Sequence, residues 1–63
     1  MDPNANLQEQ SRLIGSNSRH DIARLKELRY ALESWIDGGG FKPEETTIAR
    51  CSAAWSAFLS WSR

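Results

Sequence analysis

The sequence has few of the residues that usually hold a very small protein together. Among its 63 residues there is one cysteine, Cys51, so no disulfide can form within the chain. The only soft metal ligands, His20 and Cys51, are 31 positions apart, which is unlike the short spacing of a zinc or iron site. We therefore expect no metal, no cofactor and no small-molecule substrate, and a fold that depends on packing within or between chains.

The sequence also has no excess of charge of either sign. Eight Lys and Arg residues balance eight Asp and Glu residues, and the balance holds locally: residues 1–17 carry about −1, residues 18–37 about 0 and residues 38–63 about +1. Nucleic-acid binding depends mainly on clustered Lys and Arg side chains that contact phosphates. The charge pattern therefore disfavours a DNA-binding or RNA-binding protein.

No stretch of the sequence is apolar enough to cross a membrane. The longest run without a charged residue, Cys51 to Ser62, has 12 residues, whereas a bilayer-spanning helix needs about 20 apolar residues. The N-terminal segment MDPNANLQEQ has neither the basic start nor the apolar stretch of a signal peptide. We expect no membrane contact and a cytoplasmic location.

The first part of the sequence predicts a short, weakly amphipathic helix over about 3–14. Asp2 is a typical N-cap, Pro3 suits the first helical position, and Gly15 is a typical stop. The segment 1–17 is interpreted as a loosely docked N-terminal arm within a single domain, because its large apolar residues are few. They are Leu7, Leu13 and Ile14.

Two longer helices are predicted over about 19–37 and 43–61, separated by the segment DGGGFKP. The three glycines end the first of these helices, and Pro43 fits the first turn of the second. Such a short break favours an antiparallel hairpin. Phe41 is expected to plug the end of its seam. The seam itself should contain Ile22, Leu25, Leu28, Leu32, Trp35, Ile36, Ile48, Cys51, Trp55, Phe58 and Leu59.

These features together predict an all-α fold with one small helical domain over 1–63. The hairpin and the N-terminal helix would form a small three-helix bundle. Because so short a chain buries little surface, we expect a second copy to supply the missing contacts, so that the protein is a homo-oligomer.

The outer side of the 43–61 helix carries small residues in place of charges. Two rows follow it at four-residue spacing: Ala49, Ala53 and Ala57 in one, and Ser52, Ser56 and Ser60 in the other. Such rows occur on ordinary soluble helix surfaces, but they also let another backbone come close. We favour a second contact, made by the first helix, a second copy or a foreign protein. Three tryptophans are more aromatic surface than one seam can cover.

The predicted interaction residues lie on this outer side and on the outer side of the 19–37 helix. They are Tyr30, Ala49, Ala53, Ser56, Ala57, Ser60 and Trp61. Tyr30 projects away from the leucine stripe, where its ring either covers the stems of Lys26 and Glu33 or meets a partner.

No arrangement of residues in the sequence predicts catalysis. Cys51 has no histidine near it in sequence, and Asp21 and Glu33 lie on different parts of the helical wheel. The segment GGGF lacks the Gly-Lys-Ser/Thr ending of a phosphate-binding loop. We therefore expect a protein that is not an enzyme.

Two segments, MDPNA at the N-terminus and ALESWIDGGGFKP at residues 31–43, resemble a class of short proteins encoded by phages of actinobacteria. In that class a helix with an Ala-Leu-x-x-Trp ending runs into a Gly-Gly-Phe-x-Pro turn. The resemblance covers about 18 of the 63 residues and stops after Pro43. It implies a small virus-encoded accessory protein and assigns no functional residue.

The sequence thus favours a non-enzymatic helical module for protein–protein interaction, with itself as the first partner. Two alternatives remain at this level. One is a small DNA-binding regulator that uses the third helix for recognition, although Arg50 is the only cation on that helix before Arg63. The other is an inhibitor that captures a host protein.

Overall fold

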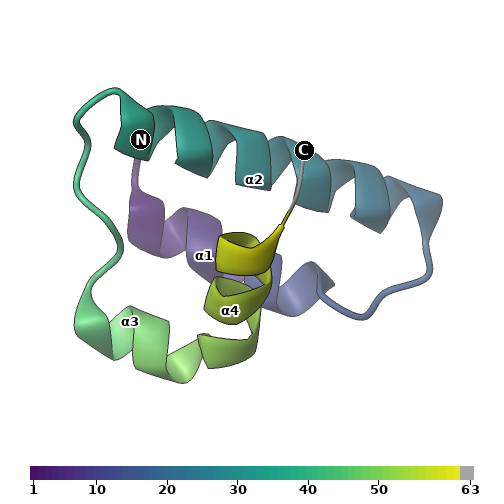
Figure 1. Ribbon diagram of the computed structural model, residues 1–63. Helices are drawn as coiled ribbons and strands as arrows, with labels where there is room; N and C mark the ends of the chain where they lie inside the picture. Colours follow the sequence, from purple (N-terminus) through teal and green to yellow (C-terminus); the bar gives the residue numbers. More distant parts are fainter. Residues whose placement is uncertain (62–63) are drawn as a thin grey trace.

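The computed structural model describes residues 1–61, which form four α-helices joined by short links (Figure 1). No β-strand occurs in this part of the chain, so the predicted all-α class is confirmed. The helices are α1 (Pro3–Leu13), α2 (Arg19–Asp37), α3 (Glu45–Arg50) and α4 (Ser52–Ser60).

The first two helices begin and end close to where the sequence predicts. The Asp2 carboxylate accepts hydrogen bonds from the backbone N–H groups of Asn4 at 2.9 Å and Ala5 at 3.3 Å, and Pro3 occupies the first turn of α1. The helix ends at Leu13, shortly before Gly15. Helix α2 has the predicted bounds and carries Asp21 in its first turn, where a carboxylate suits the helix dipole.

Helix α1 is the element around which the other three pack, which differs from the loosely docked arm that its composition indicates. It contacts α2, α3 and α4, and Figure 1 shows it beneath α2 and behind α4. Leu7 and Gln10 have no accessible surface. The expected α2–C-terminal hairpin is therefore not the centre of the fold, because α1 takes the place of the second hairpin arm against α2.

Amide side chains attach α1 to its neighbours. The Asn6 amide donates a hydrogen bond to the Leu28 carbonyl of α2 at 3.0 Å, and the Gln10 amide donates to Asn6 Oδ1 at 2.6 Å. At the other end of α1, Asn4 Oδ1 accepts the backbone N–H of Glu44 at 2.8 Å, just before α3. Helix α1 is therefore held by polar contacts as well as by its few apolar residues, which is why its composition alone predicted weak docking.

The predicted single helix over 43–61 is wrong, because the helix is bent at Cys51 into α3 and α4. Cys51 has φ −112° and ψ 38°, outside the helical range. Its N–H still bonds to the Thr47 carbonyl and its carbonyl still accepts the N–H of Trp55, both at 2.9 Å. A straight helix over 45–60 would be about 24 Å long, longer than the two smaller dimensions of the molecule, 23 and 20 Å. The bend keeps both halves on α1.

The core contains part of the predicted seam and two residues from outside it. Leu28, Leu32 and Cys51 are buried as predicted, but Ile22 and Leu59 are exposed, so their assignment to the seam is wrong. The remaining core positions are Leu7 of α1 and Ala54 of α4, which pack with Cys51. Ala54 is only 1% exposed because α4 meets α1 through this small residue.

The glycine turn after α2 holds the Trp35 ring. Gly39 has φ +95°, a conformation that favours glycine, and a Cβ added at Gly40 would overlap the Trp35 indole. The indole N–H donates to the Phe41 carbonyl at 2.9 Å. Phe41 itself is 66% exposed and stands edge-on to Trp35, with ring centroids 5.7 Å apart. The prediction that Phe41 plugs the seam is therefore wrong.

Candidate functional site

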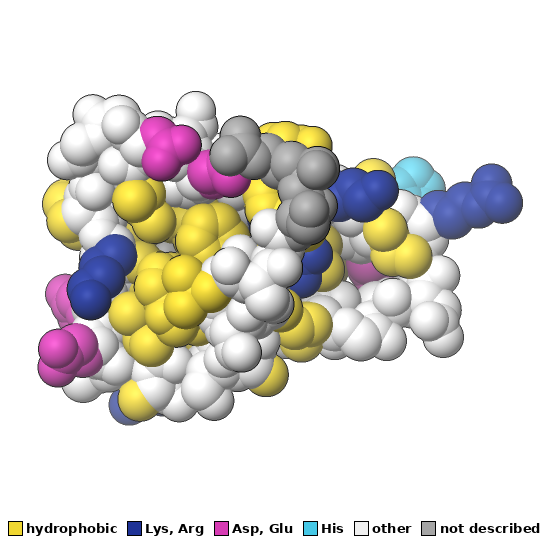
Figure 2. All heavy atoms as spheres, in the orientation of Figure 1, with side chains coloured by type: hydrophobic (Ala, Val, Ile, Leu, Met, Phe, Trp, Pro, Cys, Tyr) yellow, Lys and Arg dark blue, Asp and Glu magenta, His cyan; other side chains and the backbone are white. Residues whose placement is uncertain are grey.

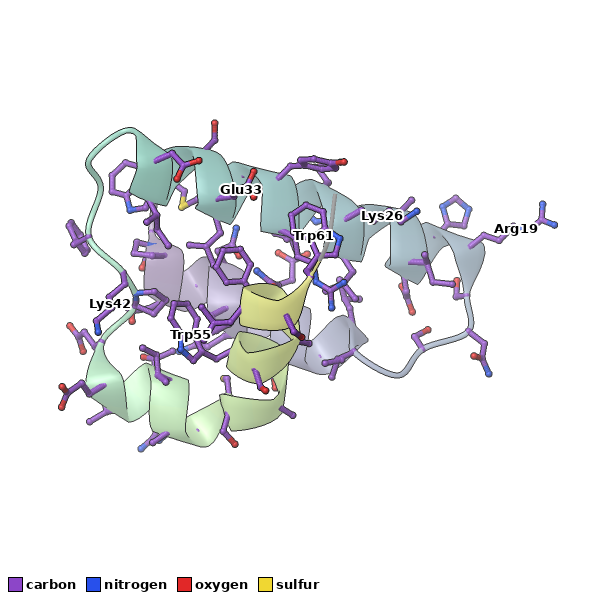
Figure 3. All side chains as sticks on the ribbon, viewed as in Figure 1. Arg19, Lys26, Glu33, Lys42, Trp55 and Trp61 are labelled. Carbon is purple, nitrogen blue, oxygen red and sulfur yellow. The ribbon has the colours of Figure 1, made fainter. Side chains whose placement is uncertain are left out.

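An open groove lies between α2, the link that follows it and α4. It has a volume of about 380 Å³, and we call it the α2–α4 groove. Figure 2 shows hydrophobic side chains gathered on this face, and Figure 3 shows Trp55 and Trp61 on the same side of the molecule. The groove is lined by Glu33, Ile36, Asp37, Lys42, Trp55, Phe58, Leu59 and Trp61.

Helix α4 supplies the apolar wall of the groove. Trp55, Phe58 and Leu59 share one face because they are three and four positions apart on a helix. The rings of Trp55 and Phe58 are stacked, with centroids 5.5 Å apart and planes at 29°. Leu59 is 65% exposed. A large, apolar and preformed surface is thus open to a partner.

An aromatic contact between Tyr30 and Trp61 joins the end of α4 to α2. The two rings meet edge-to-face with centroids 4.8 Å apart and planes at 81°. Tyr30 therefore contacts an aromatic ring of its own chain. The sequence alone suggests either that it covers the stems of Lys26 and Glu33 or that it meets a partner protein. Trp61, one of the predicted interaction residues, lines the groove at this end. With this pair, all six aromatic side chains of the sequence stand in three contacts.

Charged residues of opposite sign border the groove. Glu33 and Asp37 come from α2, one turn apart, and Lys42 comes from the link between α2 and α3. Figure 3 shows Glu33 on α2 and Lys42 on the link that follows it. Figure 2 shows acidic side chains above the hydrophobic patch and a basic side chain at its left edge, where acidic side chains also lie. Two carboxylates of α2 and one ammonium group of the link therefore lie at the border of the groove.

The small-residue rows, which begin at Ala49 on α3 and continue along α4, do not line this groove. Ala49, Ala53, Ser56 and Ser60 are exposed and Ala57 is half-buried. The Ser60 hydroxyl donates to the carbonyls of Ser56 at 3.0 Å and Ala57 at 3.4 Å, within its own helix. Because α4 meets α1 through Ala54, the alternative in which the first helix covers these rows is wrong.

Sequence reasoning missed the groove because it placed Trp55, Phe58 and Leu59 wholly inside an intrachain seam. Trp55 does pack against the core cluster, as predicted, but its accessible part lines the groove. The signal that could have found it was present. Residues 51–62 carry no charge, and the three tryptophans are too many for one seam. The bend at Cys51 turns this aromatic face of α4 partly outward, and no local sequence feature marks the bend.

A second hollow, of about 500 Å³, is lined by Gln8, Thr46, Thr47, Arg50 and Cys51. Four of its five lining residues are polar, and the fifth, Cys51, is buried.

Within residues 1–61, no group of three or more His, Cys, Asp or Glu residues is placed to hold a metal ion. Across the same residues, no helix has both the length and the apolar character needed to span a membrane.

The clearest electrostatic interaction of the fold lies outside the groove, between α1 and α2. Arg24 donates to both carboxylate oxygens of Glu9, at 2.7 and 3.0 Å, and also pairs with Glu27. The hydrogen bond from Arg24 holds the pKa of Glu9 below its ordinary value, and the same bond raises the pKa of Arg24. This pair links the accessible surfaces of α1 and α2.

Comparison of the chain with protein-family models, with curated proteins and with solved structures finds no match. The resemblance to phage-encoded accessory proteins therefore stays a prediction.

Proposed function

We propose that this chain is a non-enzymatic helical module for protein–protein interaction, that it associates with itself, and that the α2–α4 groove is the contact surface. The observation that carries the proposal is the aromatic wall of the groove, where the stacked Trp55 and Phe58 rings stand beside the exposed Leu59. Buried aromatic anchors dominate the energy of protein interfaces, and Trp is enriched among them.

Size and charge support a second copy as the partner. A 63-residue chain buries a smaller share of its surface on folding than a larger domain does, so an added interface can contribute a large part of its stability. The formal net charge is zero, which leaves no overall repulsion between copies.

The groove is a better contact surface than the alanine and serine rows. Ala49 and Ala53 offer little apolar area, and the Ser60 hydroxyl is bonded within its own helix. Capture of a host protein, an alternative that the sequence leaves open, would use the same aromatic wall and is a different outcome of the same experiments.

A matched pair of variants tests the proposal. Leu59→Glu and Ala53→Glu place the same charge on two faces of α4, and both positions are exposed in the single chain, so both variants should fold. In sedimentation equilibrium from about 5 µM to about 1 mM, we expect the wild type and Ala53→Glu to self-associate and Leu59→Glu to remain monomeric.

Two results would overturn the proposal. A wild-type chain that stays monomeric over the whole range, with melting independent of concentration, would remove self-association. Dissociation by Ala53→Glu with no effect of Leu59→Glu would place the contact on the alanine row.

A further inference from the structure

The charged residues that line the α2–α4 groove are of opposite sign, Glu33 and Asp37 from α2 and Lys42 from the link. Asp37 ends α2, with Glu33 one turn before it, and Lys42 belongs to the link that follows; all three line the groove together with its apolar residues. A two-fold contact brings a surface onto its own copy with the two sides exchanged. With the axis running between Lys42 and Asp37, Lys42 of each copy faces Asp37 of the other.

We propose that the occupant of the groove is the same groove of a second copy, in a two-fold dimer in which Lys42 of each protomer pairs with the partner's Asp37. This inference rests on the proposed function and specifies its geometry. The Leu59 side chains and the Trp55–Phe58 stacks of the two copies meet near the axis. The two Lys42–Asp37 pairs flank them and fix the orientation.

The dimensions of the chain are compatible with such a contact. A standard interface buries about 800 Å² on each partner, which is roughly a fifth of the 4291 Å² accessible surface. The apolar centre is already in place, since the stacked rings and the Tyr30–Trp61 contact hold the side chains in position. Little ordering is therefore needed when two copies meet.

Charge reversal of Lys42 and of Asp37 tests the pairing. Only a two-fold contact in which these two residues pair predicts the full set of results described below. Lys42→Glu and Asp37→Lys each create two like-charge contacts per dimer, and we expect each to raise the dimer dissociation constant at least tenfold. Both changes suit the fold. A lysine at the end of α2 and a glutamate just before α3 agree with the helix dipoles.

Two combinations should restore association. The double variant Lys42→Glu/Asp37→Lys forms opposite-charge pairs again in a homodimer. An equal mixture of the two single variants, one of them fluorescently labelled, should form a heterodimer in which both pairs are again of opposite sign. Sedimentation with fluorescence detection measures this heterodimer, and circular dichroism of each variant verifies its fold.

Several results would overturn the inference and leave the proposed function standing. Single variants that dimerise like the wild type would show that the pair is not at the interface. Rescue in the double variant without rescue in the mixture would show that the pairing is within one chain. Dissociation by Leu59→Glu with no response to either charge reversal would keep the groove and exclude the two-fold arrangement. A monomeric wild type overturns both proposals.

Discussion

The indole ring of Trp35 lies directly against Gly40, so that a Cβ at this glycine would overlap the ring. The indole N–H also bonds to the carbonyl of the next residue, Phe41, at 2.9 Å. The turn after α2 is thus built around a tryptophan side chain and not only around flexible glycines. This relationship gives a physical reason for the Trp and the Gly-Gly-Phe of the segment 31–43 to occur together.

Substitution of Gly40 by alanine should destabilise the fold by about 1–3 kcal/mol, because the added methyl group forces the Trp35 ring from its place. Urea denaturation monitored by circular dichroism measures the change. In a Trp35→Leu background the same substitution should have a much smaller effect. An equal effect in both backgrounds would show that the ring contact is not the cause.

Asn6 carries the main polar link between α1 and α2. Asn6→Ala removes the bond to the Leu28 carbonyl and leaves the buried Gln10 amide without its acceptor, so we expect a loss of about 1–3 kcal/mol in the free energy of unfolding. The exposed Asn17→Ala is the control and should change it by less than about 0.5 kcal/mol.

Replacing the whole polar chain should be less harmful than breaking it. Within residues 1–61, Gln10 Oε1 is buried and has no hydrogen-bond partner. Asn6→Leu combined with Gln10→Met removes both amides, so we expect it to recover part of the stability lost in Asn6→Ala. A double variant less stable than Asn6→Ala would mean that shape, and not hydrogen bonding, decides this contact.

Stability should depend on pH through the Glu9–Arg24 pair. The pKa of Glu9 is lowered in the folded chain, from 4.5, by its hydrogen bond to Arg24. The contribution of the pair is therefore fully present above pH 4.5 and is lost as the pH falls through the lower folded-state pKa. Denaturation of the wild type and Glu9→Gln should differ at about pH 7 and converge once the pH falls below the lowered pKa of Glu9. A difference that is constant with pH would contradict this.

The Tyr30–Trp61 contact should stabilise the end of α4. Tyr30→Ser removes the ring and should lower the free energy of unfolding by about 0.5–1.5 kcal/mol, whereas Tyr30→Phe keeps the ring and should be close to neutral. Both are compared at low protein concentration, where association does not contribute. Equal stability of the two variants would show that the edge-to-face contact does not stabilise the chain.

The sequence predicted those elements whose signals are local. The Asp2 cap, Pro3 at the first position of α1 and the bounds of α2 follow from capping, proline geometry and helical periodicity. The leucines of α2 are identified by spacing alone, and two of them, Leu28 and Leu32, are buried.

The central position of α1 and the bend at Cys51 depend on tertiary contacts, which no local sequence pattern predicts. Helix α1 is central partly because Asn6 and Asn4 bond to the backbone of other segments, while Gln10 bonds to Asn6 within α1. A search for apolar stripes counts these amides as surface. The bend at Cys51 has no proline or glycine within residues 44–61 to announce it. A helical wheel assumes one straight helix over the whole segment. It therefore gives the wrong outward face for α4 and does not reveal the groove.

The most direct test of self-association through the α2–α4 groove is a dilution series followed by the indole N–H signals in nitrogen-correlated NMR spectra. The three tryptophans give three reporters: Trp55 and Trp61 line the groove, while the Trp35 N–H is bonded to Phe41 within the turn. From about 1 mM to about 20 µM we expect the Trp55 and Trp61 signals to move and the Trp35 signal to move least. Three stationary signals, or changes confined to Ala49 and Ala53, would contradict the account.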